Sequence, residues 1–140
     1  MGRVFFDTRK NVHSLTADYQ ALASDSNKVF MLNAAAGLTL TLPAVADAQE
    51  GWNCRVVVGT VTTSNAYIVT EKTASDTNVI ISHFLGMEID TGDDGLHSTG
   101  HTTVTFEGTP ALGDHIQIFC DGTKYYATGM GVSDDFVVIA

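Results

Sequence analysis

The residues best suited to chemistry are gathered in one glycine-rich segment, residues 86–100, and in the histidine that follows it. Side chains that bind metal ions in many proteins occur there: Glu88, Asp90, Asp93, Asp94, His97 and His101. The segment lacks the alternate acidic positions and the distal glutamate of an EF-hand calcium loop. His97 and His101 are separated by serine, threonine and glycine, so this pair does not predict the face of a helix. We therefore expect mostly an exposed loop, with room for a short strand at Met87–Ile89, and no metal ion or cofactor.

Nucleophilic catalysis has no signature in the chain. It requires a serine, cysteine or threonine within reach of a base, and neither a GxSxG elbow nor a cysteine–histidine family motif occurs. The phosphate-binding GKS/T and GxGxxG patterns are also absent. His13, His83 and His115 are scattered and are expected on the surface or as hydrogen-bonded strand residues. The sequence predicts no enzyme.

The two cysteines, Cys54 and Cys120, lie on separate stretches that alternate like strands. Cys54 shares a strand face with Val56 and Val58, and Cys120 shares one with Ile116 and Ile118. We expect buried thiols rather than a disulfide or a reactive site.

Length and composition favour one folded domain. The chain has 140 residues, of which 44% are hydrophobic and 16% are charged, and a chain of this size buries a core without metal or disulfide support. Its apolar stretches are far shorter than the ~20 residues that span a bilayer, and its start does not resemble a secretory signal. We expect no membrane segment. The net charge of -9 at pH 7 opposes nucleic-acid binding, because it repels phosphate.

Charge is divided between the N-terminus and the rest of the chain. The first ten residues carry +2, which leaves -11 for the remainder. Three consecutive apolar residues, two of them aromatic, interrupt this basic stretch, and they suit addition to the sheet edge of a neighbouring protein better than a solvated tail. We expect an N-terminal arm over residues 1–14 and one β domain over residues 15–140. The arm residues expected to bind a partner are Arg3, Val4, Phe5, Phe6, Arg9 and Lys10.

Alternation of apolar and polar residues with period two is the clearest structural signal. Leu38, Leu40 and Leu42 alternate with threonines, as in a half-buried strand. The same pattern or a high β propensity predicts further strands at 28–33, 52–58, 66–71, 78–83, 103–107, 115–120 and 136–139. The helical candidate is Pro43–Gln49. We therefore predict an all-β fold: a small antiparallel β-sandwich or barrel-like domain with at most one short helix and an extended N-terminal arm.

A hairpin is predicted where Asp121-Gly122 separates two alternating runs. A two-residue turn at these positions places Ile118 opposite Tyr125 and Phe119 opposite Lys124. One face of the hairpin then resembles core. The other face carries Phe119 and Tyr126, which suits a second sheet or a partner subunit equally well.

Aromatic residues on a β scaffold also raise carbohydrate binding as an alternative, because Trp52, Tyr125 and Tyr126 could stack on sugars. The predicted register points Tyr125 inward, and Trp52 follows Gly51 at a strand entrance, a position more typical of a core residue. We regard a carbohydrate-binding module as the weaker hypothesis.

Three segments resemble small virion proteins and fibre modules of tailed bacteriophages. They are residues 22–43 (LASDSNKVFMLNAAAGLTLTLP), 51–59 (GWNCRVVVG) and 113–129 (GDHIQIFCDGTKYYATG), which together cover about half of the chain in the order seen in such proteins. Asn27 stands where a turn glycine is common in them, and Tyr125 stands where tryptophan is expected. Residues 84–101 have no counterpart.

Among such proteins, standalone chains of this size are similar to capsid decoration, or cement, proteins. The resemblance implies a homotrimer on the capsid exterior of the virion, assembled in the host cytoplasm, that binds the major capsid protein and stabilises the shell. The basic, apolar arm fits the binding of a partner in this role, and we expect the subunit interface at the hairpin face that carries Phe119 and Tyr126. The alternative is an adhesin or connector associated with a tail fibre or baseplate.

Overall fold

The computed structural model describes residues 11–72, 78–87, 95–107, 110–133 and 136–140. These residues form strands, together with one short α-helix, α1 (Val45–Ala48), and one 3-10 turn, η2 (Ala23–Asp25). The predicted all-β class is confirmed, and α1 is the core of the predicted helix at residues 43–49. None of the described helices is long and apolar enough to cross a membrane.

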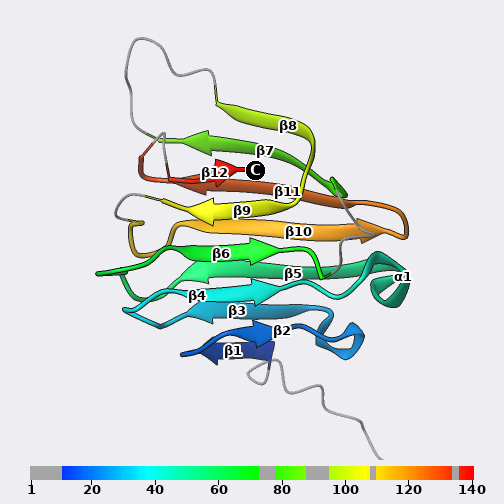
Figure 1. Cartoon of the computed structure of the whole chain (residues 1–140), viewed down its shortest axis with the longest axis horizontal. Coiled ribbons are helices and arrows are strands. Elements are labelled where there is room, and N and C mark those ends of the chain that lie inside the picture. The colour runs from blue at the N-terminus through cyan, green and yellow to red at the C-terminus, as the bar shows by residue number, and fades with distance from the viewer. Residues whose placement is uncertain (1–10, 73–77, 88–94, 108–109, 134–135) are drawn as a thin grey trace, which may run out of the picture.

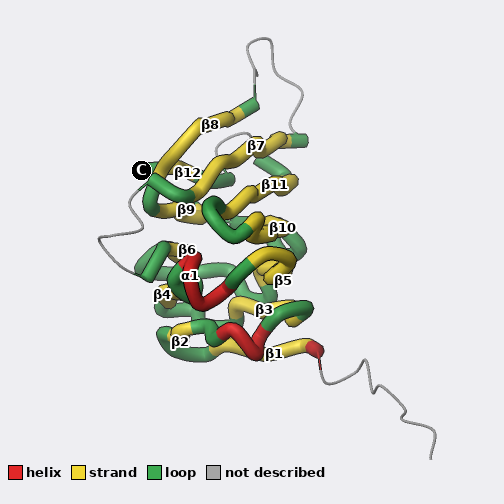
Figure 2. Tube along the Cα trace, turned by 90° about the vertical axis from the view of Figure 1, so that its right-hand side faces the viewer, coloured by secondary structure: helices red, strands yellow, loops and turns green. Residues whose placement is uncertain are grey.

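The strands form two mixed sheets that lie as two layers in Figure 2. The larger sheet, sheet A, has the order β1-β3-β5-β10-β11-β7-β8. Its strands are β1 (Val12–Leu15), β3 (Lys28–Leu32), β5 (Glu50–Val58), β10 (His115–Asp121), β11 (Tyr125–Gly131), β7 (Ile80–Gly86) and β8 (Leu96–His101).

The smaller sheet, sheet B, has the order β12-β9-β6-β4-β2. Its strands are β12 (Val138–Ile139), β9 (Thr103–Phe106), β6 (Tyr67–Thr70), β4 (Leu38–Thr41) and β2 (Tyr19–Gln20). Figure 1 looks through the two layers, so that strands of sheet B overlie strands of sheet A.

The first six strands alternate between the sheets, and this path explains why the predicted antiparallel pairing is only partly correct. β1, β3 and β5 pair in parallel in sheet A, and β2, β4 and β6 pair in parallel in sheet B. Parallel neighbours need a crossover connection, which is usually a helix. Here each crossover contains a strand of the opposite sheet, so parallel pairs form in an almost purely β chain. The remaining strand pairs are antiparallel, except that β11 pairs in parallel with β7.

The core lies between the two sheets and is built from the inward side of each alternating strand. Leu40 and Val104 from sheet B and Val56 and Ile118 from sheet A have no exposed surface. The same is true of Tyr67, whose hydroxyl accepts a hydrogen bond from the Ala34 amide and lies within hydrogen-bond distance of two carbonyl oxygens. The predicted inward positions of the alternating strands are thus confirmed.

Two boundaries differ from the prediction. β1 begins at Val12, so residues 12–14 of the predicted arm pair with β3 at the edge of sheet A. Within the predicted loop at residues 86–100, Leu96 begins strand β8, while residues 88–94 lie outside the described part of the chain.

The β10–β11 hairpin exists, but its register is two residues away from the predicted one. Tyr125 pairs with Cys120, and Tyr126 pairs with Phe119. The turn therefore centres on Gly122 and Thr123, and Gly122 has a φ of 92°, which favours glycine. A shift of two residues leaves every side chain on its predicted face, because side chains alternate with period two.

Candidate protein-interaction surface

The outward side of sheet A carries an unusual set of side chains. We define it as the outer face, and the described residues on it are Val12, Ser14, Val29, Met31, Asn53, Arg55, Val57, Ile81, His83, Leu85, His97, His115, Gln117, Phe119, Asp121, Tyr126, Thr128 and Met130. None of them is buried. Arg55 and Asp121 are the charged side chains in this set, although the whole chain carries a net charge of -9.

An aromatic pair lies near one end of the outer face. The rings of Phe119 and Tyr126 are stacked, with centroids 5.0 Å apart and an interplanar angle of 13°. Ile81 follows Tyr126 in the same row on β7. Phe119 is 48% exposed even though it is stacked, so the pair offers a rigid apolar contact to another molecule.

The hairpin turn holds this aromatic pair in place. The Asp121 carboxylate accepts hydrogen bonds from the Thr123 amide and hydroxyl and from the Lys124 amide, at 2.7–2.8 Å. These bonds lower the pKa of Asp121 to about 2. Asp121 is also hydrogen-bonded to the Tyr126 hydroxyl, which raises the pKa of that tyrosine. The carboxylate therefore fixes both the turn and the aromatic ring beside it.

A second apolar row crosses the outer face four residues further along the strands. Val57, His115, Met130 and Leu85 are successive partners on β5, β10, β11 and β7. Met130 is 41% exposed and Leu85 is 56% exposed. Two apolar rows thus flank a polar row that contains Gln117 and Thr128.

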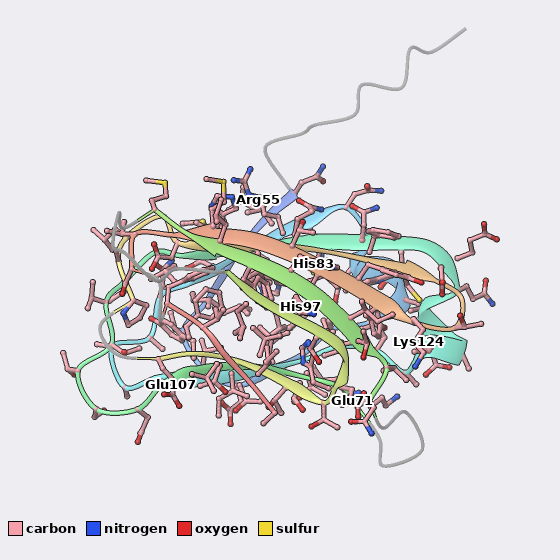
Figure 3. The ribbon with its side chains drawn as sticks, turned by 90° about the horizontal axis from the view of Figure 1, so that it is seen from above. Arg55, Glu71, His83, His97, Glu107 and Lys124 are labelled. Carbon is pink, nitrogen blue, oxygen red and sulfur yellow. The ribbon has the colours of Figure 1, made fainter. Side chains whose placement is uncertain are left out.

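The outward side of sheet B is different in character, because it is rich in threonine. Thr39 and Thr105 flank Ile68 in one row, and Thr41, Thr70 and Thr103 form the next row. In Figure 3 Arg55 lies on the side of the molecule away from Glu71 and Glu107. The two sides of the protein therefore present different chemistry, and the outer face is the more apolar one.

The residues predicted from sequence to bind a partner fall into two groups. Phe119 and Tyr126 are neighbours on the outer face, although the register that joins them was not the predicted one. The arm residues, Arg3, Val4, Phe5, Phe6, Arg9 and Lys10, lie outside the described residues.

Two of the three aromatic residues considered for sugar stacking are buried. Trp52 is 2% exposed and donates its indole N–H to the Leu22 carbonyl. Tyr125 has no exposed surface and donates its hydroxyl to the Pro43 carbonyl at 2.6 Å. Only Tyr126 remains available to a sugar, and a single ring is a poor platform.

Ser82 and His101 form a contact that sequence reasoning missed. Ser82 Oγ lies 2.7 Å from His101 Nε2, and His101 Nδ1 lies 3.0 Å from the Thr103 carbonyl oxygen. Because a carbonyl oxygen can only accept, Nδ1 carries the proton and Ser82 donates to Nε2. Such a pair resembles a nucleophile and its base, but the exposed fractions are 0% for Ser82 and 3% for His101. In this conformation no substrate can reach the Ser82 hydroxyl, and the hydrogen bond to His101 stabilises the core.

The segment that was considered as a metal site lies only partly within the described residues. Glu88, Asp90, Asp93 and Asp94 lie outside the described residues. Among the described residues no three histidine, cysteine, aspartate or glutamate side chains are grouped to hold a metal ion. Cys54 and Cys120 form no disulfide and are both buried, as expected, and burial raises the pKa of the Cys54 thiol.

No protein-family model matches this chain, and neither a curated protein nor a solved structure matches it significantly.

Proposed function

We propose that this chain is a structural protein of a tailed-phage particle that acts by binding and assembly. In its most specific form, the proposal is a capsid decoration protein that forms a homotrimer on the outside of the shell and binds the major capsid protein. A protein that binds only the assembled shell stabilises that shell by mass action. The observation that carries the proposal is the outer face of sheet A.

The composition of the outer face supports a role in protein contacts. The cores of protein interfaces are enriched in aromatic residues, methionine and arginine and are depleted of lysine, glutamate and aspartate. The outer face has Phe119, Tyr126, Met130 and Arg55, and the carboxylate among its described residues, Asp121, lies at the turn end of β10 and is engaged in hydrogen bonds. Because the chain has 16 acidic residues, a surface this wide whose described carboxylate lies only at the hairpin turn favours a contact surface over an ordinary solvated one.

The fold supports the same interpretation. We propose that the two layers are a β-sandwich rather than a closed barrel, because each sheet ends in two different edge strands, β1 and β8 in sheet A and β12 and β2 in sheet B. Open edges can accept an added strand from a neighbour. In the sequence, the basic, apolar N-terminal segment ends directly before β1, which is one of these edge strands.

Cryo-EM of native particles tests the location. The proposal predicts density for this chain on the outside of the shell, grouped around threefold positions. Density on the tail alone would overturn the capsid assignment and favour the alternative, a tail-fibre or baseplate-associated adhesin or connector.

Deletion of residues 1–10 tests the arm. We expect the truncated chain to remain folded and oligomeric and to lose binding to expanded capsids, because the basic and apolar contacts are removed. A full-length control with Val4, Phe5 and Phe6 changed to serine keeps the charge and separates the two contributions. Undiminished capsid binding by the truncated chain would refute a docking arm.

A further inference from the structure

His83 and His97 lie directly opposite each other on β7 and β8, at the edge of the outer face. Their ring centroids are 6.0 Å apart, and the ring planes are nearly parallel, with an angle of 12°. Both side chains are exposed. Directly opposed residues of antiparallel strands have Cβ atoms about 4.5–5.5 Å apart, so both side chains can reach one bound ion. Figure 3 labels both histidines.

A β-bulge in β8 creates this pair. Ser82 pairs with Ser98, but Ile80 pairs with His101, so β8 has one residue more than β7 between these pairs. Strict alternation would place His97 and His101 on the same face. The extra residue instead turns His101 into the core and leaves His97 beside His83 on the outside.

Because of the bulge, His101 and the His83–His97 pair have different surroundings. Both ring nitrogens of His101 are engaged, by Ser82 and by the Thr103 carbonyl. Within the described part of the chain, no hydrogen bond engages the ring nitrogens of His83 or His97. With respect to the described residues, their imidazole nitrogens are available to a ligand.

We propose that His83 and His97 form a two-ligand site for a divalent transition-metal ion of the zinc type. Imidazole nitrogen is a preferred ligand of zinc, nickel and copper. At a Zn–N distance of 2.0–2.1 Å and tetrahedral geometry, the two nitrogens must come within roughly 3.4 Å of each other. The χ2 torsion of histidine is broad, so rotation of the two exposed rings supplies this approach without moving the strands. Water completes the coordination.

The electrostatic surroundings favour a cation at this position. Arg55 lies in the same row of the sheet, but β10 and β11 separate its strand from β7. At about 4.8 Å per strand, Arg55 is roughly 14 Å from His83, which exceeds the Debye length of about 8 Å at physiological salt. The net charge of -9 attracts cations to the protein as a whole.

Calorimetric titration of the purified full chain with zinc chloride, in a buffer that does not chelate zinc, tests the site. We expect one zinc ion per chain, and we expect His83→Ala and His97→Ala each to weaken binding at least about tenfold, since each removes one of two protein ligands. His115→Ala is the matched control. His115 is on the same face but its partners there are Val57 and Met130, so this variant keeps the wild-type affinity.

Substitution of copper(II) for zinc gives a spectroscopic readout, because nitrogen ligands are visible in its electron paramagnetic resonance. We expect two histidine nitrogens in the wild type and one in each single variant. Unchanged zinc affinity in the His83→Ala/His97→Ala double variant, or no zinc binding by the wild type, would overturn the proposal. Far-UV circular dichroism confirms that each variant is folded. The site is tested on the isolated chain, so its failure is independent of the proposed role in a phage particle.

Discussion

The hydrogen bond from Ser82 to His101 joins β7 to the end of β8 inside the core. Ser82 satisfies the one ring nitrogen of His101 that the Thr103 carbonyl does not. A buried polar atom that loses its partner costs about 1–3 kcal/mol. We therefore expect the hydrogen bond between Ser82 and His101 to contribute measurably to the free energy of unfolding.

We expect Ser82→Ala to lower the free energy of unfolding by about 1–3 kcal/mol, because His101 Nε2 is left in the core without a donor. Urea denaturation followed by circular dichroism measures the change. Thr128→Ala, an exposed substitution on neighbouring β11, is the control and should stay within about 0.5 kcal/mol of the wild type. Equal stability of the two variants would contradict a stabilising contact.

The same histidine makes stability depend on pH. Burial lowers the pKa of His101 below its ordinary value of 6.5, so the unfolded chain binds more protons than the folded one between these two values. The contribution of neutral His101 to the free energy of unfolding is therefore fully present above pH 6.5. It decreases as the pH falls from 6.5 towards the lower pKa of the folded state.

We expect the urea midpoint to be lower at pH 5 than at pH 7.5, and we expect this difference to shrink in His101→Gln, which does not titrate. A pH difference of the same size in His101→Gln would assign the effect to other groups.

At the scale of elements, Asp25 links β2 of sheet B to β3 of sheet A. Its buried carboxylate accepts hydrogen bonds from the Tyr19 hydroxyl on β2, the Leu22 amide and the Lys28 ammonium on β3, at 2.6–2.9 Å. Desolvation acts to raise the pKa of Asp25, but the hydrogen bonds from Lys28, Leu22 and Tyr19 outweigh it and lower the pKa. The stability that this carboxylate provides is therefore lost only as the pH falls below about 4.

Asp25→Asn should lower the free energy of unfolding by about 2 kcal/mol at pH 7, because it removes charge-assisted hydrogen bonds and points an amide N–H at one of the donors. Thermal or urea denaturation measures the loss. The control is Asp47→Asn, since Asp47 is 59% exposed and meets Lys72 at 3.4 Å, and surface pairs contribute little. If both variants are equally stable, Asp25 does not hold this end of the fold.

The elements that sequence reasoning missed are edge strands. Strands β1, β2 and β8 lie at sheet edges, and their sequences, VHSL, YQ and LHSTGH, are short or polar. An edge strand buries little apolar surface, so alternation is weak there. The central strands bury one whole face, and for this reason their positions could be predicted.

The hairpin shows the same limit for the candidate surface. The period-two pattern predicted that Phe119 and Tyr126 share a face, but it could not decide between registers that differ by two residues. The Asp121 hydrogen bonds to Thr123 and Lys124 select the observed one. The His83–His97 pair could not be predicted at all, because it depends on a strand and a bulge that the sequence did not indicate.

At the scale of the whole molecule, the chain winds through the two sheets before it closes with antiparallel strands. Successive parallel partners are 17 residues apart for Val12 and Val29 but 26 apart for Lys28 and Cys54. A path with turns of unequal length leaves no fixed repeat in the sequence. This irregularity explains why the parallel arrangement was not predicted from the sequence.

This arrangement gives the molecule one apolar side and one threonine-rich side. Assembly through the apolar side is the central claim, because the proposed trimer depends on it. Phe119 and Tyr126 form a stacked aromatic contact on that side, and Phe119 is 48% exposed. Hot-spot residues at interfaces, among which aromatic side chains are enriched, contribute about 2 kcal/mol or more.

Sedimentation equilibrium of the purified full chain, in a buffer that contains a metal chelator, tests this claim most directly. We predict a mass of about 45 kDa for the wild type, three times the 14.9 kDa of one chain. For the double variant Phe119→Ser/Tyr126→Ser we predict a folded protein, and we predict that the equilibrium constant for dissociation of its trimer is at least about 30-fold larger than that of the wild type. The variant Thr105→Ser, on the other side of the molecule, should remain a trimer. A wild type that stays at 14.9 kDa at all concentrations, or a double variant as trimeric as the wild type, would contradict the account.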